Sequence, residues 1–337
     1  MENNITSLYL DSTSYQQLKN DQHTFDIGRK LSILIKKIIL NYYPKYNQEK
    51  KELQNKIISS VVHECDTHTF SDIECSNIAW NIIKYLGEVS INKKNTSSAK
   101  QHKIKINFRI NNDEDDLDTI LKSCPSGAAK SEFIANIIYS YLEKPQYERE
   151  RIVFKPVFDK LNTAIKNKQQ VIIKTKTSNI NKISPKAICS SKEELYNYLL
   201  YQSTSYKSDC AYSIHLYNIV AVTLEPSTIS FSNEINNKFD RMIANGVQYS
   251  ISDDTIYKIK LDEKGQKLYN SFYIEKPVAL DCSDPENGIY YFNCSNMQFE
   301  NFFASFYNHM IVLEPESYRL KYISHMQEIL DNYKIKK

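Results

Sequence analysis

The sequence predicts an α+β protein, in which strands and helices occupy separate stretches of a 337-residue chain. Residues 103–110 alternate apolar and polar side chains as a half-buried strand does, and two stretches with helical spacing follow them. Short β-type runs dominate residues 171–224, and strands alternate with helices after residue 256. The length suits two or three domains. The boundaries that we expect enclose residues 1–147, 148–230 and 231–337.

The start of the chain contains the pattern of one strand and two helices. Residues 5–10 have the composition of a strand, residues 12–20 that of a short helix, and residues 26–43 that of a longer helix rich in Ile and Leu. Because side chains alternate along a strand, three of them share one face of this strand. They are Ile5, Ser7 and Tyr9.

Two further helices, residues 48–64 and 71–89, are expected to serve packing. The segment from His63 to His68 brings two imidazoles and a thiol together, but its spacing misses the HExxH pattern by one residue. We therefore favour ordinary surface residues over a zinc site and expect no metal. Residues 92–102 are polar and basic, which is typical of a linker.

Residues 103–145 carry the clearest pattern in the chain. The strand has an apolar face and a basic, polar face that contains Lys103, Lys105, Asn107 and Arg109. Acids at positions 113–116 suit the start of a first helix, and a second helix with apolar spacing ends before Pro145. A strand and two helices are too small to bury their own apolar face, so this unit requires a partner strand.

This strand-helix-helix order resembles the ribbon-helix-helix family, in which two copies pair their strands and present the outer face to nucleic acid. Residues 5–43 are interpreted as a degenerate second copy. Pairing within one chain would set Ile5, Ser7 and Tyr9 beside the polar side chains of residues 105–109, so only one side would be basic. Pairing between chains stays open, as does a dimerisation unit that contacts no nucleic acid.

Residues 148–230 predict a connecting helix followed by a small antiparallel β-barrel. Pro156 enters the helix, and the strands are expected at residues 171–177, 183–189, 195–203 and 210–224. Lys174 and Lys176 lie on one face of the first strand.

This region resembles the WYL domain, a small barrel of the Sm and SH3 type found in prokaryotic regulators. The segment that gives the domain its name falls on residues 196–201, with tyrosine in place of tryptophan. In the family a later strand carries two arginines that line a ligand or nucleic-acid groove, and their positions hold His215 and Asn218 here. Both side chains can still form hydrogen bonds with bases or phosphate. A barrel that only links its neighbours is the alternative.

Residues 231–337 predict a helix at 233–244 and then a ferredoxin-like order of elements. The strands are expected at residues 256–261, 278–282, 289–294 and 310–313, and the helices at 264–273, 299–306 and 318–333. The ending resembles the C-terminal extension of WYL proteins, which implies dimerisation. A plain packing appendage is the alternative.

Composition excludes several classes of protein. The net charge of +3 is too small to indicate a nucleic-acid partner by itself, and six glycines argue against the Gly-rich phosphate loops of dehydrogenases, kinases and ATPases. Seven cysteines without a signal peptide indicate a reducing cytoplasm, and no apolar run could cross a membrane. The 25 tyrosines include candidates for stacking on bases.

The whole arrangement resembles the WYL-domain accessory proteins of type VI CRISPR systems, subtype D. This implies a non-catalytic cytoplasmic homodimer without cofactors, which binds single-stranded RNA and stimulates an RNA-guided, RNA-targeting effector ribonuclease in antiviral defence. The residues expected to bind nucleic acid are Lys103, Lys105, Asn107, Arg109, Lys174, Lys176, Tyr198, Tyr201, His215 and Asn218.

Two other functions are open. A transcriptional regulator would bind duplex DNA through the ribbon and use the WYL-like domain as a sensor. A nuclease would use the acids at positions 113–116 around a metal ion. We disfavour the nuclease because these acids suit a helix N-terminus and no matching His or Lys lies nearby in sequence to act as a base.

Overall fold

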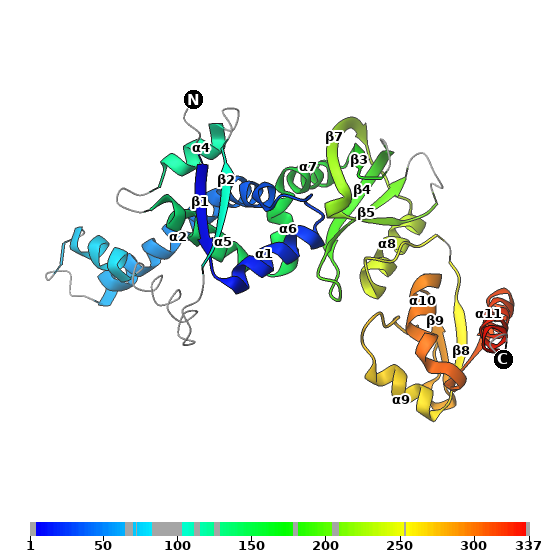
Figure 1. Cartoon of the computed structure of the whole chain (residues 1–337). Coiled ribbons are helices and arrows are strands. Elements are labelled where there is room, and N and C mark those ends of the chain that lie inside the picture. The colour runs from blue at the N-terminus through cyan, green and yellow to red at the C-terminus, as the bar shows by residue number, and fades with distance from the viewer. Residues whose placement is uncertain are drawn as a thin grey trace. The chain divides into compact units, whose positions relative to one another are not determined.

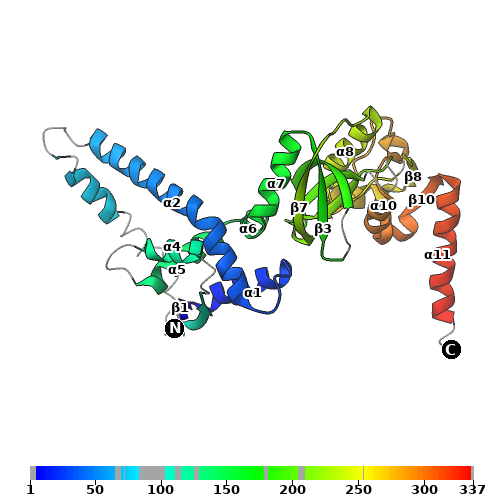
Figure 2. The ribbon, with the colours of Figure 1, turned by 90° about the horizontal axis from the view of Figure 1, so that it is seen from above.

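The computed structural model describes residues 5–64, 70–71, 73–82, 103–110, 115–124, 129–177, 181–203, 209–252 and 254–334. The chain divides into two compact units, and the division in the sequence falls between Val153 and Phe154. Helices and small antiparallel sheets occur in both units, which confirms the α+β class (Figures 1 and 2). Among the described helices, none combines the length and the apolar character that a membrane crossing requires.

A two-stranded ribbon begins the first unit. Strand β1 (Ile5–Leu10) pairs antiparallel with β2 (Ile104–Arg109), and the two strands lie side by side in Figure 1. Leu8, Leu10 and Phe108 are buried on one face, as their alternation predicts. The two strands therefore pair within one chain, which is one of the two arrangements that the sequence leaves open.

Helices α5 (Lys130–Leu142) and α2 (Leu31–Glu64) contact the strands of the ribbon. The first unit also contains α1 (Ser12–Thr24), α4 (Asp115–Lys122) and α6 (Gln146–Val153), which pack against α2, and residues 73–82 are also helical. Asp11 caps α1, because its carboxylate accepts a hydrogen bond from the Ser14 backbone at 2.9 Å. Apolar side chains of α2 and α5 are fully buried, among them Ile38 and Ile137.

The sequence wrongly divides α2 into two helices. Residues 26–43 and 48–64 are predicted as separate elements, whereas α2 continues through Pro44 (Figure 2). Proline removes one backbone hydrogen bond from a helix interior. Tyr42 and Tyr46, on either side of Pro44, are both buried, so the apolar stripe and its packing continue past it.

The second unit begins with α7 (Lys155–Lys166) and a five-stranded antiparallel sheet in the order β6-β5-β4-β3-β7. Its strands are β3 (Gln169–Thr175), β4 (Asn181–Ser190), β5 (Asn197–Ser203), β6 (Tyr212–His215) and β7 (Ile219–Thr228). Register shifts in β3 and β4 bend the strands. Helix α8 (Asn233–Asn245) follows.

Two details of this sheet correct the prediction. The run 210–224 is interrupted by a 3-10 turn at Leu216–Asn218, which separates β6 from β7. These two strands are the edges of the sheet and do not pair with each other, so the described strands do not form the closed barrel that we expected.

The C-terminal part contains β8 (Tyr257–Leu261), β9 (Ile289–Phe292) and β10 (Met310–Glu314), in the order β10-β8-β9. The accompanying helices are α9 (Glu263–Ser271), α10 (Asn296–Phe303) and α11 (Glu316–Lys334), with 3-10 segments at Pro285–Asn287 and Ala304–His309. The strand expected at residues 278–282 is reduced to one bridge, from Ala279 to Phe292. The described sheet is therefore one strand short of the ferredoxin-like pattern.

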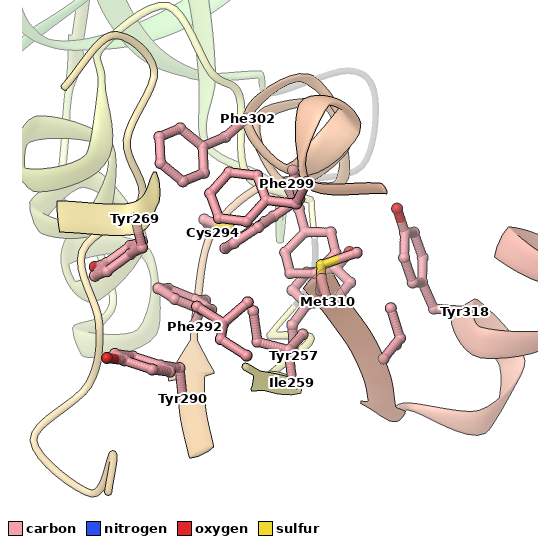
Figure 3. Close-up of a cluster of buried hydrophobic side chains, with 14 residues drawn as sticks. Tyr257, Ile259, Tyr269, Tyr290, Phe292, Cys294, Phe299, Phe302, Met310 and Tyr318 are labelled. Carbon is pink, nitrogen blue, oxygen red and sulfur yellow. The ribbon is translucent and has the colours of Figure 1, made fainter. Parts of the chain in front are cut away.

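Aromatic side chains form the core of this C-terminal part, and Figure 3 shows them in one cluster. Tyr257 of β8 stacks on Phe299 of α10 with a distance of 4.1 Å between ring centroids. Tyr318 of α11 meets both rings edge to face, at 5.0 and 5.3 Å. Such pairs add to the burial of apolar surface, so this cluster is expected to hold the three elements together.

Phe299→Ala is expected to destabilise this part of the protein by about 3–5 kcal/mol, because the ring is fully buried and its loss leaves a cavity. The calorimetric unfolding transition of the full chain measures this loss. The control is Tyr333→Ala, because the Tyr333 side chain is 80% exposed. This substitution is expected to change the free energy of unfolding by less than about 0.5 kcal/mol. A Phe299 effect as small as that of the control would contradict a packed core.

Candidate nucleic-acid interface

The outer face of the ribbon carries four of the predicted residues. Lys105, Asn107 and Arg109 of β2 are exposed, and Lys103 lies exposed just before the strand. Their partners on β1 are uncharged, because Tyr9 lies opposite Lys105, Ser7 opposite Asn107 and Ile5 opposite Arg109. The face is therefore basic on one strand only.

Side-chain contacts across this face hold two of the polar residues in place. The Ser7 hydroxyl donates a hydrogen bond to Asn107 Oδ1 at 2.9 Å. Lys105 Nζ lies 5.9 Å from the centroid of the Tyr9 ring, which is 41% exposed. A cation beside an open aromatic ring can contact a phosphate and an unpaired base together.

In the second unit, the structure brings Lys176 close to the turn that contains Asn218. The Lys176 backbone N–H donates to the Asn218 carbonyl at 3.0 Å, and Lys176 Nζ lies 5.0 Å from the Tyr217 ring centroid. Lys174 is exposed on β3, opposite Ala221 of β7. The two lysines thus flank the end of the sheet where β7 begins.

His215 lies within a group of tyrosines that we call the aromatic cluster: Tyr196, Tyr198 and Tyr217. Their ring centroids lie 5.2, 4.2 and 4.8 Å from that of His215. Tyr198 is only 4% exposed, so its ring offers no open face for a base and supports His215 instead. The predicted Tyr201 lies further along β5, stacked on Tyr212 at 5.6 Å, and burial raises the pKa of its hydroxyl.

A pocket of about 360 Å³ opens beside the aromatic cluster, and Tyr198, His215 and Asn218 line it. The sequence does not predict the other polar residues of its wall, which come from strand β6, from loops and from the C-terminal part. They are Glu194, Ser213, Gln248, Tyr249, Ser250, Glu275 and Asn301. No spacing in the sequence links these residues, because only the tertiary fold brings them together.

The protonation state of His215 follows from its surroundings. Its Nε2 lies 3.0 Å from the Tyr198 hydroxyl, which also contacts the Glu194 carboxylate. Burial lowers the pKa of His215 from its ordinary value of 6.5, because an imidazolium loses hydration there, and Glu194 acts in the opposite sense. The neutral ring is therefore favoured in the folded protein.

This lowered pKa predicts a pH-dependent stability. The folded state binds the His215 proton less readily than the unfolded chain does. The contribution of neutral His215 to the free energy of unfolding is therefore fully present above pH 6.5, and it is lost as the pH falls through 6.5 towards the lower pKa of the folded state. When the pH is lowered from about 7.5 to about 5.5, the Tm of the His215→Phe variant should therefore decrease less than the Tm of the unaltered protein. Equal losses in thermal melts would contradict a buried neutral imidazole.

Within the described residues, no group of three or more His, Cys, Asp or Glu side chains is arranged to hold a metal ion. The segment from Cys65 to His68 and the acids Asp113 and Glu114 lie outside the described residues, so the structure does not address them.

Comparison with known proteins shows a fold that is shared with a solved structure but assigns the chain to no family. No family model matches the chain, and no curated protein matches it. A solved structure described as "Crystal structure of a CRISPR Cas-related protein" is similar with a TM-score of 0.63 and 17% identity, over 99% of this chain and 95% of that one. The two proteins therefore share a fold along nearly their whole length.

A second solved structure is the proteasome accessory factor B/C (PafBC) of Arthrobacter aurescens. It is 15% identical and covers 64% of this chain and 35% of its own, but its TM-score of 0.26 is too low to support an inference. The resemblances to the ribbon-helix-helix and WYL families remain expectations.

Proposed function

We propose that this protein is a non-catalytic accessory protein of a CRISPR system, which binds single-stranded RNA and stimulates an RNA-guided, RNA-targeting type VI effector. The observation that supports this most is the fold shared along almost the entire chain with a CRISPR Cas-related protein. Fold alone does not define function, so the proposal also depends on the chemistry of the ribbon.

The ribbon favours a single strand over a duplex palindrome. A palindromic operator is read by two equivalent strands, whereas here Lys105 and Arg109 face the uncharged Tyr9 and Ile5 positions of the partner strand. Lysine and arginine neutralise phosphates in any nucleic acid, and the half-open Tyr9 ring can stack on an unpaired base.

The alternative function is a DNA-binding transcriptional regulator. Its supporting observation is the ribbon itself, because an antiparallel strand pair followed by helices is a known reader of the major groove. Under this alternative, duplex DNA is the partner and the second unit acts as a sensor.

We also propose that the protein works as a homodimer. Helix α11 exposes Leu320, Ile323 and Leu330, which lie 3 and 7 residues apart and so share one side of the helix. Exposed apolar surface of this kind is often covered by another subunit. Sedimentation of the full chain measures the association state.

The function is tested by cleavage of a target RNA by a purified type VI-D effector, with and without this protein. We expect faster cleavage with the unaltered chain and little stimulation with a Lys105→Ala, Arg109→Ala double variant. An unchanged cleavage rate, at protein concentrations that saturate the RNA, would contradict the accessory role while leaving RNA binding intact.

A further inference from the structure

The pocket beside His215 lacks the cations that a phosphate site needs. Its charged walls are the carboxylates of Glu194 and Glu275, and no lysine or arginine occurs among the described residues that line it. Phosphate is bound by Arg, Lys or clustered backbone N–H groups, and nearby carboxylates repel it. The pocket therefore suits a neutral or positively charged group that donates hydrogen bonds.

His215 offers an unused acceptor at this pocket. The Tyr198 hydroxyl has one proton, which it donates to Glu194, so its oxygen accepts the proton of His215 Nε2 at 3.0 Å. In the neutral ring Nδ1 then holds only a lone pair. Nδ1 is buried and has no hydrogen-bond partner in the described part of the chain, so a ligand donor would satisfy it.

Gln248 supplies a second acceptor. Its Nε2 donates to Glu193 Oε2 at 3.1 Å, which fixes the orientation of the amide. Its Oε1 is buried and lacks a partner within the residues that the structure describes. The Ser213 hydroxyl, also on the pocket wall, already donates to the Gln248 backbone carbonyl at 3.1 Å.

Uncommon backbone conformations occur at Glu275 and at the residue that follows Glu194. Glu275 has φ +58°, and Leu195, which follows Glu194, has φ +59°. Non-glycine residues rarely adopt this left-handed region, and such strain clusters at functional sites. The Glu275 conformation is held from both sides, because its N–H donates to Glu193 Oε1 and its carbonyl accepts from Gln298 Nε2 at 3.1 Å.

We propose that this pocket binds a guanine base, either free or within RNA. The Watson–Crick edge of guanine presents the N1–H and N2–H groups as adjacent donors, which suits a carboxylate and a neighbouring acceptor. Uracil offers one N–H on that edge. The volume of about 360 Å³ lies in the range of small-ligand pockets, and the Met297 and Tyr249 side chains on its wall can contact a flat ring. Binding of a guanine within RNA depends on the proposed function, whereas binding of free guanosine does not.

Calorimetric titration of the full chain with guanosine, adenosine, cytidine and uridine tests this proposal. We expect guanosine to bind at least about tenfold more tightly than uridine, and inorganic phosphate not to compete. The His215→Phe substitution keeps an aromatic ring at this position but removes the Nδ1 acceptor. It should weaken guanosine binding about tenfold. Glu275→Gln is the second variant, since it removes a carboxylate and leaves the backbone hydrogen bonds of that residue intact.

Lys122→Ala, in the first unit, is the control and should leave guanosine affinity unchanged, because the Lys122 side chain is 73% exposed and has no part in the pocket. The proposal would be overturned if guanosine did not bind, if uridine bound with equal affinity, or if phosphate competed with guanosine.

The RNA arm compares a U-rich single strand with the same strand containing one guanosine. Guanosine binding without RNA binding would support the pocket and contradict the proposed function, whereas RNA binding without guanosine binding would contradict the pocket alone.

Discussion

Replacing both Lys105 and Arg109 by alanine is expected to weaken single-stranded RNA binding about twenty- to thirtyfold near 0.1 M salt. Both side chains are exposed on one face of β2, and each phosphate that they neutralise releases counterions. The slope of log affinity against log salt should become less steep by about 1.4, which is about 0.7 for each lost contact. Fluorescence anisotropy with labelled RNA across a salt series measures both changes.

A double variant elsewhere controls for the loss of net charge. Lys260 and Lys264 are exposed in the C-terminal part, so Lys260→Ala with Lys264→Ala removes the same charge away from the ribbon. We expect less than about a threefold change and an unaltered salt slope, because distant charges are screened. Equal losses in the two double variants would show that bulk charge, and not the ribbon, binds the RNA.

Arg149→Met is expected to destabilise the first unit by about 3–5 kcal/mol, the usual result of breaking a buried ion pair. Two guanidinium nitrogens of Arg149 donate to the Asp21 carboxylate at 2.8 Å, and Tyr141 donates to it at the same distance. Asp21 is 2% exposed and Arg149 is 9% exposed. Removing the arginine leaves a buried carboxylate with its charge uncompensated, and urea unfolding of the full chain measures the loss.

The matched control for this variant breaks an exposed ion pair in the same unit. Lys122 pairs with Asp118 one turn earlier on α4, and its side chain is 73% exposed. Exposed pairs contribute little because water and salt screen them, so Lys122→Met should unfold at the same urea concentration as the unaltered protein. A comparable loss in both variants would contradict the buried network around Asp21.

The ribbon could be predicted from the sequence because a half-buried strand imposes strict alternation. Lys105, Asn107 and Arg109 lie on its outer face as predicted, and Leu8 and Phe108 lie on the inner face. Its partner strand follows from the same pattern near the N-terminus. Alternation alone could not decide between pairing within one chain and pairing between chains.

Tertiary contacts explain the strand that the sequence predicts wrongly at residues 278–282. The Val278 N–H donates to the Asn245 side chain at 2.8 Å, and the Pro277 carbonyl accepts from the Tyr269 hydroxyl at 3.0 Å. Side chains thus engage backbone groups that a strand pair would use, so only the bridge at Ala279 remains. Such competition has no local signal in the sequence.

The candidate site in the second unit was only partly predictable. His215 and Asn218 were found through a resemblance, and both line the pocket. Glu194, Gln248 and Glu275 were not found, because they lie on separate loops and their proximity depends on the tertiary fold. An acidic residue in a loop has no spacing that distinguishes a pocket wall from an ordinary solvated surface.

Binding of the full chain to single-stranded RNA, single-stranded DNA and duplex DNA of matched sequence, across a salt series, tests the central claim most directly. We expect the tightest binding to single-stranded RNA, with an affinity that falls steeply as salt rises and depends little on the sequence outside guanosine. A preference for duplex DNA that disappears in the Lys105→Ala, Arg109→Ala variant would contradict the RNA-binding function and establish the ribbon as a reader of DNA.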